Sequence, residues 1–330
     1  MSGAPIHFEE TEGEIRAALG QETGQAGDGW TLETVGVRRQ VVRANHPDGE
    51  RSLAVKWCEL AEVARAEWTG LVSLRRGTAP LVEPVFLAGR VLATAWLDAP
   101  RADTMLLRSP RRQRAECLRQ AGEWLAALHA NATRRRVSRD FRNVCSQLRR
   151  RFKADRRVAA DGLLHALDQR ARRIGSVERD GVPLHWDFKP HNLFLTGRGI
   201  VGFDVGSFRV GLPMHDAASF LTAVELERYQ AEVRGVRPAG TVDADRRAFF
   251  RGYGALDAED APLLDMIEDQ LLVGRWLRHG TVFEPPVERV VATARALAAR
   301  GLPEGGTATR PGRLVRRARL WPRWSDRFGP

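Results

Sequence analysis

The sequence predicts an α+β protein of two lobes, a small β-rich lobe followed by a larger, mostly helical one. Three observations support this prediction. Short apolar runs bounded by turn residues dominate residues 30–97, whereas helical periodicity dominates residues 98–301. A polar segment rich in Asp, Asn and Pro interrupts the helical pattern within residues 183–206. A chain of 330 residues is long enough to bury a core in each lobe.

The first lobe is expected to follow residues 1–29, an acidic and Gly-rich stretch that would form an extension or one short helix. Residues 31–43 favour strands because of their valines. A turn sequence at 46–49, His-Pro-Asp-Gly, separates them from an apolar strand at 53–57. These segments are expected to pair as a hairpin.

The rest of this lobe contains one helix and two strands. Residues 59–75 have a helical composition, with apolar side chains recurring on one face. Short apolar strands are expected at 82–87 and 91–96, which completes a small β-rich lobe with one helix. Residues 98–108 are expected to be a linker into the second lobe.

The second lobe is expected to be built mainly of helices. Helical patterns cover residues 111–129, 141–152, 163–174, 216–229, 243–253, 262–278 and 286–299. Two short apolar runs, 193–195 and 200–203, would form a small hairpin that carries the polar segment. Residues 302–330, rich in Gly, Pro and Arg, are expected to form a basic flexible tail.

The composition favours a cytoplasmic protein. No apolar run is long enough for a membrane-spanning helix, and the first residues lack the features of a signal peptide. The three cysteines, Cys58, Cys117 and Cys145, are odd in number and far apart, so they fit neither a disulfide framework nor a zinc cluster. A reducing compartment is therefore expected.

The net charge of +11 has two interpretations, an anionic partner or an Arg-rich surface that is simply solvated. The second is favoured because no RNA-binding or helix-turn-helix signature is present, so no specific nucleic-acid partner is expected. Of 52 basic residues only three are lysines, namely Lys56, Lys153 and Lys189. Two of these stand where phosphate chemistry would use a compact ammonium group that Arg cannot replace.

The most informative segment runs from His185 to Asn192 and is followed by Asp204. Asp187 is the candidate base that would accept a proton from an attacking hydroxyl group. Asn192 and Asp204 supply oxygen ligands of the kind that Mg²⁺ prefers, and Lys189 could reach the γ-phosphate. The spacing therefore predicts phosphoryl transfer from ATP with Mg²⁺ as cofactor. The alternative is a turn in which these side chains only cap backbone groups.

A second group of candidates lies in the first lobe. Lys56, inside an apolar strand, would hold the α- and β-phosphates, although a lone strand Lys can also extend to solvent. Glu67 on the following helix is its expected ion-pair partner, with Glu62 as a competitor. The stretch that would cover the phosphates has one glycine, Gly36, so it lacks the Gly-rich pattern usual for such loops.

These motifs resemble those of the aminoglycoside phosphotransferase and choline kinase group, which has the protein-kinase-like fold. The resemblance spans residues 35–225. Its matching segments are Leu-Ala-Val-Lys at 53–56, Trp-Leu-Asp at 96–98, Trp-Leu-Ala-Ala-Leu-His at 124–129, the polar segment 185–192, Asp204, and Gly-Leu-Pro-Met-His-Asp-Ala-Ala at 211–218.

The resemblance implies a two-lobed protein-kinase-like fold and roles for three further residues. Trp96, at the hinge between the lobes, is expected to join the residues that bind the nucleotide. Asp216 is expected to support the catalytic loop structurally together with His185, and a helix N-cap at Asp216 is compatible with that role. The chain departs from the group at Trp186, where small-molecule kinases often have glycine.

The expected function is phosphorylation of a hydroxyl group on a small molecule of the aminoglycoside, amino alcohol or sugar type. Acidic residues within 257–269 could line a pocket for a cationic acceptor or form a solvated helix face, whereas Arg209 would suit a phosphate or carboxylate. The alternatives are a protein kinase or cell-envelope sugar or lipid kinase on the same fold, and a pseudokinase that acts as a binding module.

The tail could contact an anionic membrane surface weakly through residues 313–324, although a disordered or self-docking tail is favoured.

Overall fold

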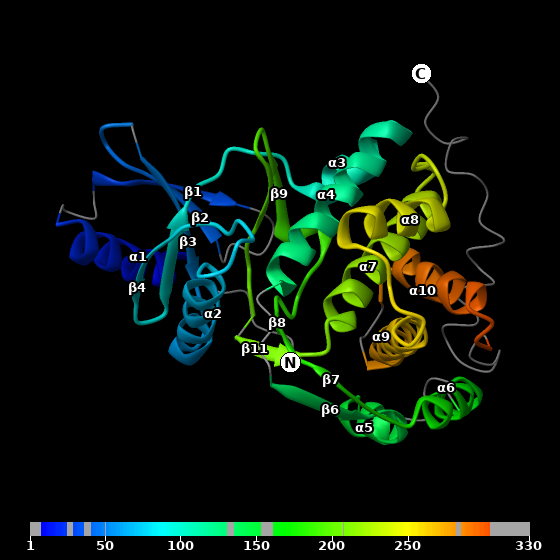
Figure 1. Ribbon diagram of the computed structural model, residues 1–330. Helices are drawn as coiled ribbons and strands as arrows, with labels where there is room; N and C mark the ends of the chain where they lie inside the picture. The colour runs from blue at the N-terminus through cyan, green and yellow to red at the C-terminus, as the bar shows by residue number, and fades with distance from the viewer. Residues whose placement is uncertain are drawn as a thin grey trace.

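The computed structural model describes residues 8–24, 29–35, 41–49, 51–130, 135–152, 161–206, 208–281 and 285–303. Within these ranges a small antiparallel sheet with helices α1 and α2 lies beside a larger lobe made mainly of helices (Figure 1). The predicted two-lobed α+β architecture is therefore confirmed.

The sheet of the small lobe has five antiparallel strands in the order β1-β2-β3-β5-β4. They are β1 (Thr31–Val35), β2 (Val41–Asn45), β3 (Ser52–Trp57), β4 (Pro84–Ala88) and β5 (Val91–Ala95). Alternate residues of β2 and β3 are buried, so Val42, Leu53 and Val55 share one apolar face. The same alternation turns Lys56 to the opposite face of the sheet.

Helix α1 (Phe8–Thr23) packs on the small lobe and forms part of its core. Ile15, Ala18 and Leu19 are buried in the same cluster as Trp30 and the strand residues. Their spacing places them on one face of a helix, which explains why this acidic segment folds against the sheet. Within the stretch 1–29, expected to form an extension or one short helix, α1 therefore contributes a helix of 16 residues to the small lobe.

Helix α2 (Ala61–Leu74) joins the two cores. It follows β3 and lies against β4 and β5, yet Leu71 and Leu74 are buried in the cluster of the large lobe together with Leu92 of β5. The helix that carries Glu67 is thus held by both lobes. The expected linker 98–108 contains a helix, α3 (Ala102–Arg108), because Ala102 and Leu106 lie one turn apart and are both buried.

Each helix expected in the large lobe is present. The helices are α4 (Arg111–His129), α5 (Val144–Arg151), α6 (Asp161–Ile174), α7 (Met214–Val233), α8 (Val242–Tyr253), α9 (Ala261–Thr281) and α10 (Val287–Ala299). Helix α7 packs against α9 and α10, and α4 packs tightly along α8 (Figure 1). Glycines permit the α4–α8 approach, since a Cβ at Gly252 would lie only 1.9 Å from the carbonyl oxygen of Arg119.

Short strands complete the large lobe. The expected hairpin is formed by β9 (Leu193–Thr196) and β10 (Gly199–Gly202). Two antiparallel pairs were not expected, β8 (Val182–Leu184) with β11 (Arg209–Gly211) and β6 (Arg136–Asp140) with β7 (Ser176–Asp180). Their partners are distant in sequence, so local patterns do not reveal them.

The expected tail lies outside the described residues from residue 304 onward. Leu302, which the prediction placed in the tail, is buried in the core of the large lobe. No described helix is both long and apolar enough to cross a membrane.

Leu19→Ala tests whether α1 belongs to the core of the small lobe. Because Leu19 is fully buried, we expect a loss of about 2–5 kcal/mol in the free energy of unfolding, measured by chemical denaturation. Gln21→Ala, at an exposed position of the same helix, is the control and should change little. Equal stability of the two variants would contradict the core role of α1.

Candidate active site

The two groups of predicted site residues meet where the lobes join. Lys56 Nζ lies 2.7 Å from Glu67 Oε2 of α2 and 2.5 Å from Asp204 Oδ1, just beyond β10. Lys56 and Asp204 are 148 residues apart in the chain, so only the tertiary fold brings them together. Glu67, rather than its competitor Glu62, is the partner of the lysine.

The three charged groups perturb one another. Burial acts to lower the pKa of Lys56, but Glu67 and Asp204 raise it above its ordinary value, so the ammonium group stays protonated. Burial raises the pKa of Glu67 to about 7, and the charge of Asp204 adds to the rise while Lys56 opposes it. Burial also acts to raise the pKa of Asp204, yet Lys56 and His185 bring it below its ordinary value. Asp204 is therefore the carboxylate that stays ionised.

Backbone hydrogen bonds fix the position of Asp204. Gly202 of β10 bonds to the segment that precedes β4, with Val82 N donating to Gly202 O at 3.0 Å and Gly202 N donating to Pro80 O at 3.0 Å. Phe203 N then donates to Asn192 O at 3.1 Å, which ties this segment to the loop of residues 185–192. Asp204 itself adopts φ 54°, a left-handed conformation that Asp tolerates better than most residues.

Asp187 is held by side chains of its own loop. Asn192 Nδ2 donates to the carbonyl oxygen of Asp187 at 2.9 Å and to Oδ2 at 3.1 Å, and Lys189 Nζ donates to Oδ1. Because the amide nitrogen of Asn192 faces Asp187, the amide oxygen is the atom that remains for a cation. The structure thus brings Asp187, Lys189 and Asn192 together as the spacing predicted.

Asp216, in the first turn of α7, anchors this loop through its backbone. Oδ2 accepts a hydrogen bond from His185 N at 2.7 Å, and Oδ1 accepts one from Trp186 N at 2.9 Å. The carboxylate is fully buried; burial acts to raise its pKa, but the neighbouring histidines hold the pKa below its ordinary value. Asp216 therefore binds the loop amides and does not cap its own helix.

Two residues that the sequence analysis missed support Asp216 in turn. His129 Nε2, at the end of α4, lies 3.5 Å from Asp216 Oδ2, and Tyr253, at the end of α8, has its hydroxyl group 3.0 Å from His129 Nδ1. His129 ends the matching segment 124–129, which was the only signal for it. His185 is also fully buried, where burial lowers its pKa, and its Nε2 lies 3.1 Å from Phe203 O.

Trp186 occupies a conformation that usually needs glycine. Its φ of 69° costs a residue with a Cβ about 1–2 kcal/mol. The hydrogen bond to Asp216 and stacking on His215, with ring centroids 4.4 Å apart, hold it in place. The guanidinium of Arg209 lies 4.6 Å from the centre of the Trp186 ring, so this arginine makes a cation–π contact with the loop of residues 185–192.

Asp204 and Asn192 fit a magnesium ion by the chemistry of their donors, one ionised carboxylate and one amide oxygen. Among the described residues, no group of three or more His, Cys, Asp or Glu could hold a metal by itself. A cation here would therefore need phosphate oxygens and water as additional ligands, which is how Mg²⁺ is usually bound beside nucleotides.

The other predicted site residues are placed less completely. Gly36 lies outside the described residues. Trp96 follows β5, its ring lies 4.9 Å from the guanidinium of Arg43, and its buried Nε1 has no hydrogen-bond partner among the described residues.

Most acidic residues of 257–269 are engaged by arginines. Glu268 and Asp269 are buried, and neither belongs to a solvated helix face. The contacts are Arg246 Nη1 to Glu268 Oε1 at 2.6 Å, Arg300 Nη2 to Glu268 Oε2 at 2.6 Å, Arg170 Nη1 to Asp269 Oδ2 at 2.5 Å, and Arg179 to Glu259 and Asp260 at 2.9 and 3.3 Å. These ion pairs join helices of the large lobe, so Glu268 and Asp269 serve the structure of this lobe.

Comparison with known proteins agrees with this geometry. The family model APH, described as the phosphotransferase enzyme family, matches residues 24–263. The chain belongs to this family. The expected resemblance is thus confirmed, and the protein is a phosphotransferase. No curated protein matches the chain.

Solved structures of other phosphotransferases share the fold. A choline/ethanolamine kinase family protein from Mesorhizobium loti is 14% identical, with a TM-score of 0.61 over 96% of this chain and 100% of that one. A putative fructosamine-3-kinase from Thermobifida fusca is 19% identical, with a TM-score of 0.55 over 86% and 98%. The macrolide 2′-phosphotransferase MphH from Brachybacterium faecium is 15% identical, with a TM-score of 0.54 over 86% and 97%. The protein-kinase-like fold of this phosphotransferase is therefore confirmed.

Gly70→Ala tests how α2 is seated on the segment that contains Asp204. A Cβ at Gly70 would lie 2.4 Å from the carbonyl oxygen of Gly206, so the helix must shift and carry Glu67 away from Lys56. We expect the affinity for Mg·ATP, measured by calorimetry, to fall about tenfold or more, since small misplacements in such sites are costly.

The control is Gly13→Ala, an exposed α1 position where an added Cβ meets no atom within 4 Å. Alanine should stabilise either helix by about 1 kcal/mol through propensity alone. A Gly70→Ala protein that is more stable and binds Mg·ATP normally would show that the close contact does not position Glu67.

Proposed function

We propose that this phosphotransferase transfers the γ-phosphoryl group of ATP to a hydroxyl group of a small molecule, with Mg²⁺ as cofactor. The observation that carries the proposal is the contact of Lys56 with both Glu67 and Asp204 across the lobe junction. It sets a fixed ammonium group beside an ionised carboxylate, the pair that a nucleotide triphosphate and its cation require.

Each residue of the site has a role in this proposal. Lys56 binds the α- and β-phosphates and is oriented by Glu67, while Asp204 and Asn192 would hold the cation. When bound, Mg²⁺ supplies charge neutralisation on the phosphate oxygens. Asp187 orients the acceptor hydroxyl group and takes its proton, and Lys189, now paired with Asp187, lies in the loop that would meet the γ-phosphate.

Gly36 and Trp96 complete the proposed nucleotide site, and His185 and Asp216 act as positioning residues for the loop. Support for a small polar acceptor comes from structural neighbours, a glucosamine kinase solved with glucosamine and ADP and a spectinomycin phosphotransferase solved with ADP and spectinomycin. An aminoglycoside, amino alcohol or sugar is the acceptor class we propose. A cytoplasmic location, where ATP is available, is part of the same proposal and agrees with three free cysteines.

Asp187→Asn is expected to reduce turnover by at least about 10²-fold, because the amide cannot take the proton of the hydroxyl group. ADP release is measured against a panel of aminoglycosides, amino alcohols and sugars. Stabilisation by Mg·ATP in a thermal-shift assay should remain, since Asp187 is not a phosphate ligand in this proposal. Asp180→Asn, which alters an exposed carboxylate of β7, is the control.

Three outcomes would contradict the proposal. Turnover retained by Asp187→Asn would remove the proposed base. No thermal stabilisation of the wild-type protein by millimolar Mg·ATP would favour the pseudokinase alternative. Labelling of a protein or lipid fraction but of no free small molecule would favour the kinases of macromolecules or cell-envelope components.

A further inference from the structure

A cavity of about 120 Å³ lies between α4 and α8, and none of the proposed active-site residues lines it. Its volume is several times what one water molecule needs, so it can hold a small ion. The lining comes from the N-terminal part of α4, from Ala239 and Gly240, and from both buried and exposed residues of α8. Four of the lining side chains are arginines, Arg111, Arg114, Arg247 and Arg251.

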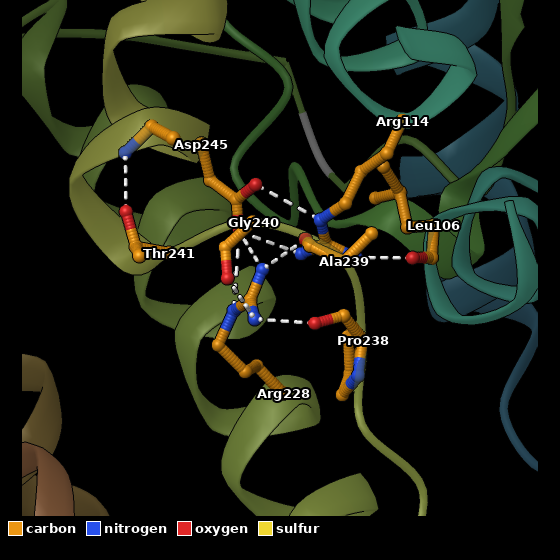
Figure 2. A network of polar contacts seen from close by, with 9 residues as sticks. Leu106, Arg114, Arg228, Pro238, Ala239, Gly240, Thr241 and Asp245 are labelled. Atoms are coloured by element: carbon orange, nitrogen blue, oxygen red, sulfur yellow. Dashed lines mark hydrogen bonds and ion pairs between the residues drawn. The ribbon is translucent and has the colours of Figure 1, made fainter. Parts of the chain in front are cut away.

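Two of the lining residues, Arg114 and Asp245, belong to a buried polar network that also includes Arg228 and carries more positive than negative charge (Figure 2). Arg114 donates two hydrogen bonds to Asp245, from Nε to Oδ1 at 2.9 Å and from Nη2 to Oδ2 at 2.7 Å. Arg228 donates to the same carboxylate, with Nη2 to Oδ2 at 2.9 Å. The side chains of the three residues are only 3–7% exposed. Two guanidinium groups therefore share one carboxylate in a poorly solvated place, where uncompensated charge is costly.

Arg228 and Arg114 differ in how many of their N–H groups have a hydrogen-bond acceptor. Besides Asp245, Arg228 donates to the carbonyl oxygens of Pro238, Ala239 and Gly240 at 2.8–3.0 Å, so all five of its N–H groups are used (Figure 2). Arg114 has one further acceptor, the carbonyl oxygen of Leu106. Two N–H groups of Arg114 thus have no acceptor among the described residues, and Arg114 lines the cavity.

The rim of the cavity adds positive charge without a counter-charge. Arg111, Arg247 and Arg251 are exposed and make no hydrogen bond or ion pair with any described side chain. Arg247 and Arg251 are four residues apart on α8, a spacing at which like charges repel. Arg246, the chain neighbour of Arg247, is by contrast paired with Glu268. The oxygens of Asp245 already accept from two guanidinium groups, so this carboxylate does not compensate the rim.

We propose that this cavity binds a phosphate-type oxyanion, either free inorganic phosphate or the phosphate group of a small phosphorylated metabolite. A tetrahedral anion with several oxygens suits a ring of guanidinium groups, which bind such oxygens in pairs. It would give the two free N–H groups of Arg114 an acceptor and relieve the repulsion between Arg247 and Arg251. The first turns of α4 and α8 also line the cavity, and their N-terminal partial charges act in the same direction.

The test is calorimetric titration of the full chain with inorganic phosphate at constant ionic strength. It is done on the wild type and on Lys56→Met, in which the phosphate contact proposed for the active site is removed. Binding that persists in Lys56→Met and is lost when the rim arginines of the cavity are also replaced belongs to the cavity. We expect it to persist, and to be about a hundredfold weaker or absent when Arg247→Gln and Arg251→Gln are added together, since each lost charged contact is worth roughly a factor of ten.

Arg112→Gln in the Lys56→Met background is the matched control, because Arg112 is an exposed α4 arginine that does not line the cavity. This control should leave phosphate affinity unchanged. Each variant alters an exposed or half-buried position and is expected to fold, which melting curves will verify. Glycerol 3-phosphate distinguishes the two sources: equal or tighter binding than inorganic phosphate indicates a phosphorylated metabolite, and weaker binding indicates the free ion. No saturable phosphate binding in Lys56→Met, or equal affinity in the Arg112 and Arg247/Arg251 variants, would overturn the proposal.

Discussion

The ion-pair triad of Lys56, Glu67 and Asp204 is the interaction on which the proposed site depends. It joins a strand of the small lobe, a helix buried against both lobes and the segment that follows the β9–β10 hairpin. A half-buried ion pair contributes little net stability, because desolvation offsets much of the attraction. We therefore interpret the triad as a positioning element. It fixes the two lobes relative to each other at the place proposed for the triphosphate.

A second set of contacts, centred on the buried carboxylate of Asp216, supports the loop that contains Asp187. Asp216 accepts hydrogen bonds from two successive amides of the loop that contains Asp187, His129 at the end of α4 lies next to Asp216, and Tyr253 at the end of α8 contacts His129. The same two helices, tightly packed along glycines, enclose the arginine cavity near their first turns. The large lobe thus supports the loop from the interior of the protein.

Much of this site could be predicted because its parts are local in sequence. The alternation of β3 turns Lys56 away from the apolar face, and the spacing from Asp187 to Asn192 lies within one loop. Helix α4 could be placed from its apolar periodicity for the same reason. The meeting of Lys56 with Asp204 needed the resemblance to a known fold, since nothing local links residues so far apart.

The parts that were missed depend on tertiary partners. The pairing of β6 with β7 joins two polar strands with no strong pattern, and α3 is a single short helix whose burial is set by the large lobe. The acidic stretch after residue 257 suggested a pocket, but charge in a sequence does not reveal which arginine will neutralise it. The left-handed backbone at Trp186 likewise depends on Asp216 and His215.

The most direct test of the central claim is a double-mutant cycle on Mg·ATP affinity with Lys56→Met and Asp204→Asn. If both side chains act on one bound nucleotide and its cation, each single variant weakens binding and the two effects are coupled by about 1 kcal/mol or more. Effects that add within about 0.5 kcal/mol, or a variant that binds Mg·ATP as the wild type does, would contradict the claim.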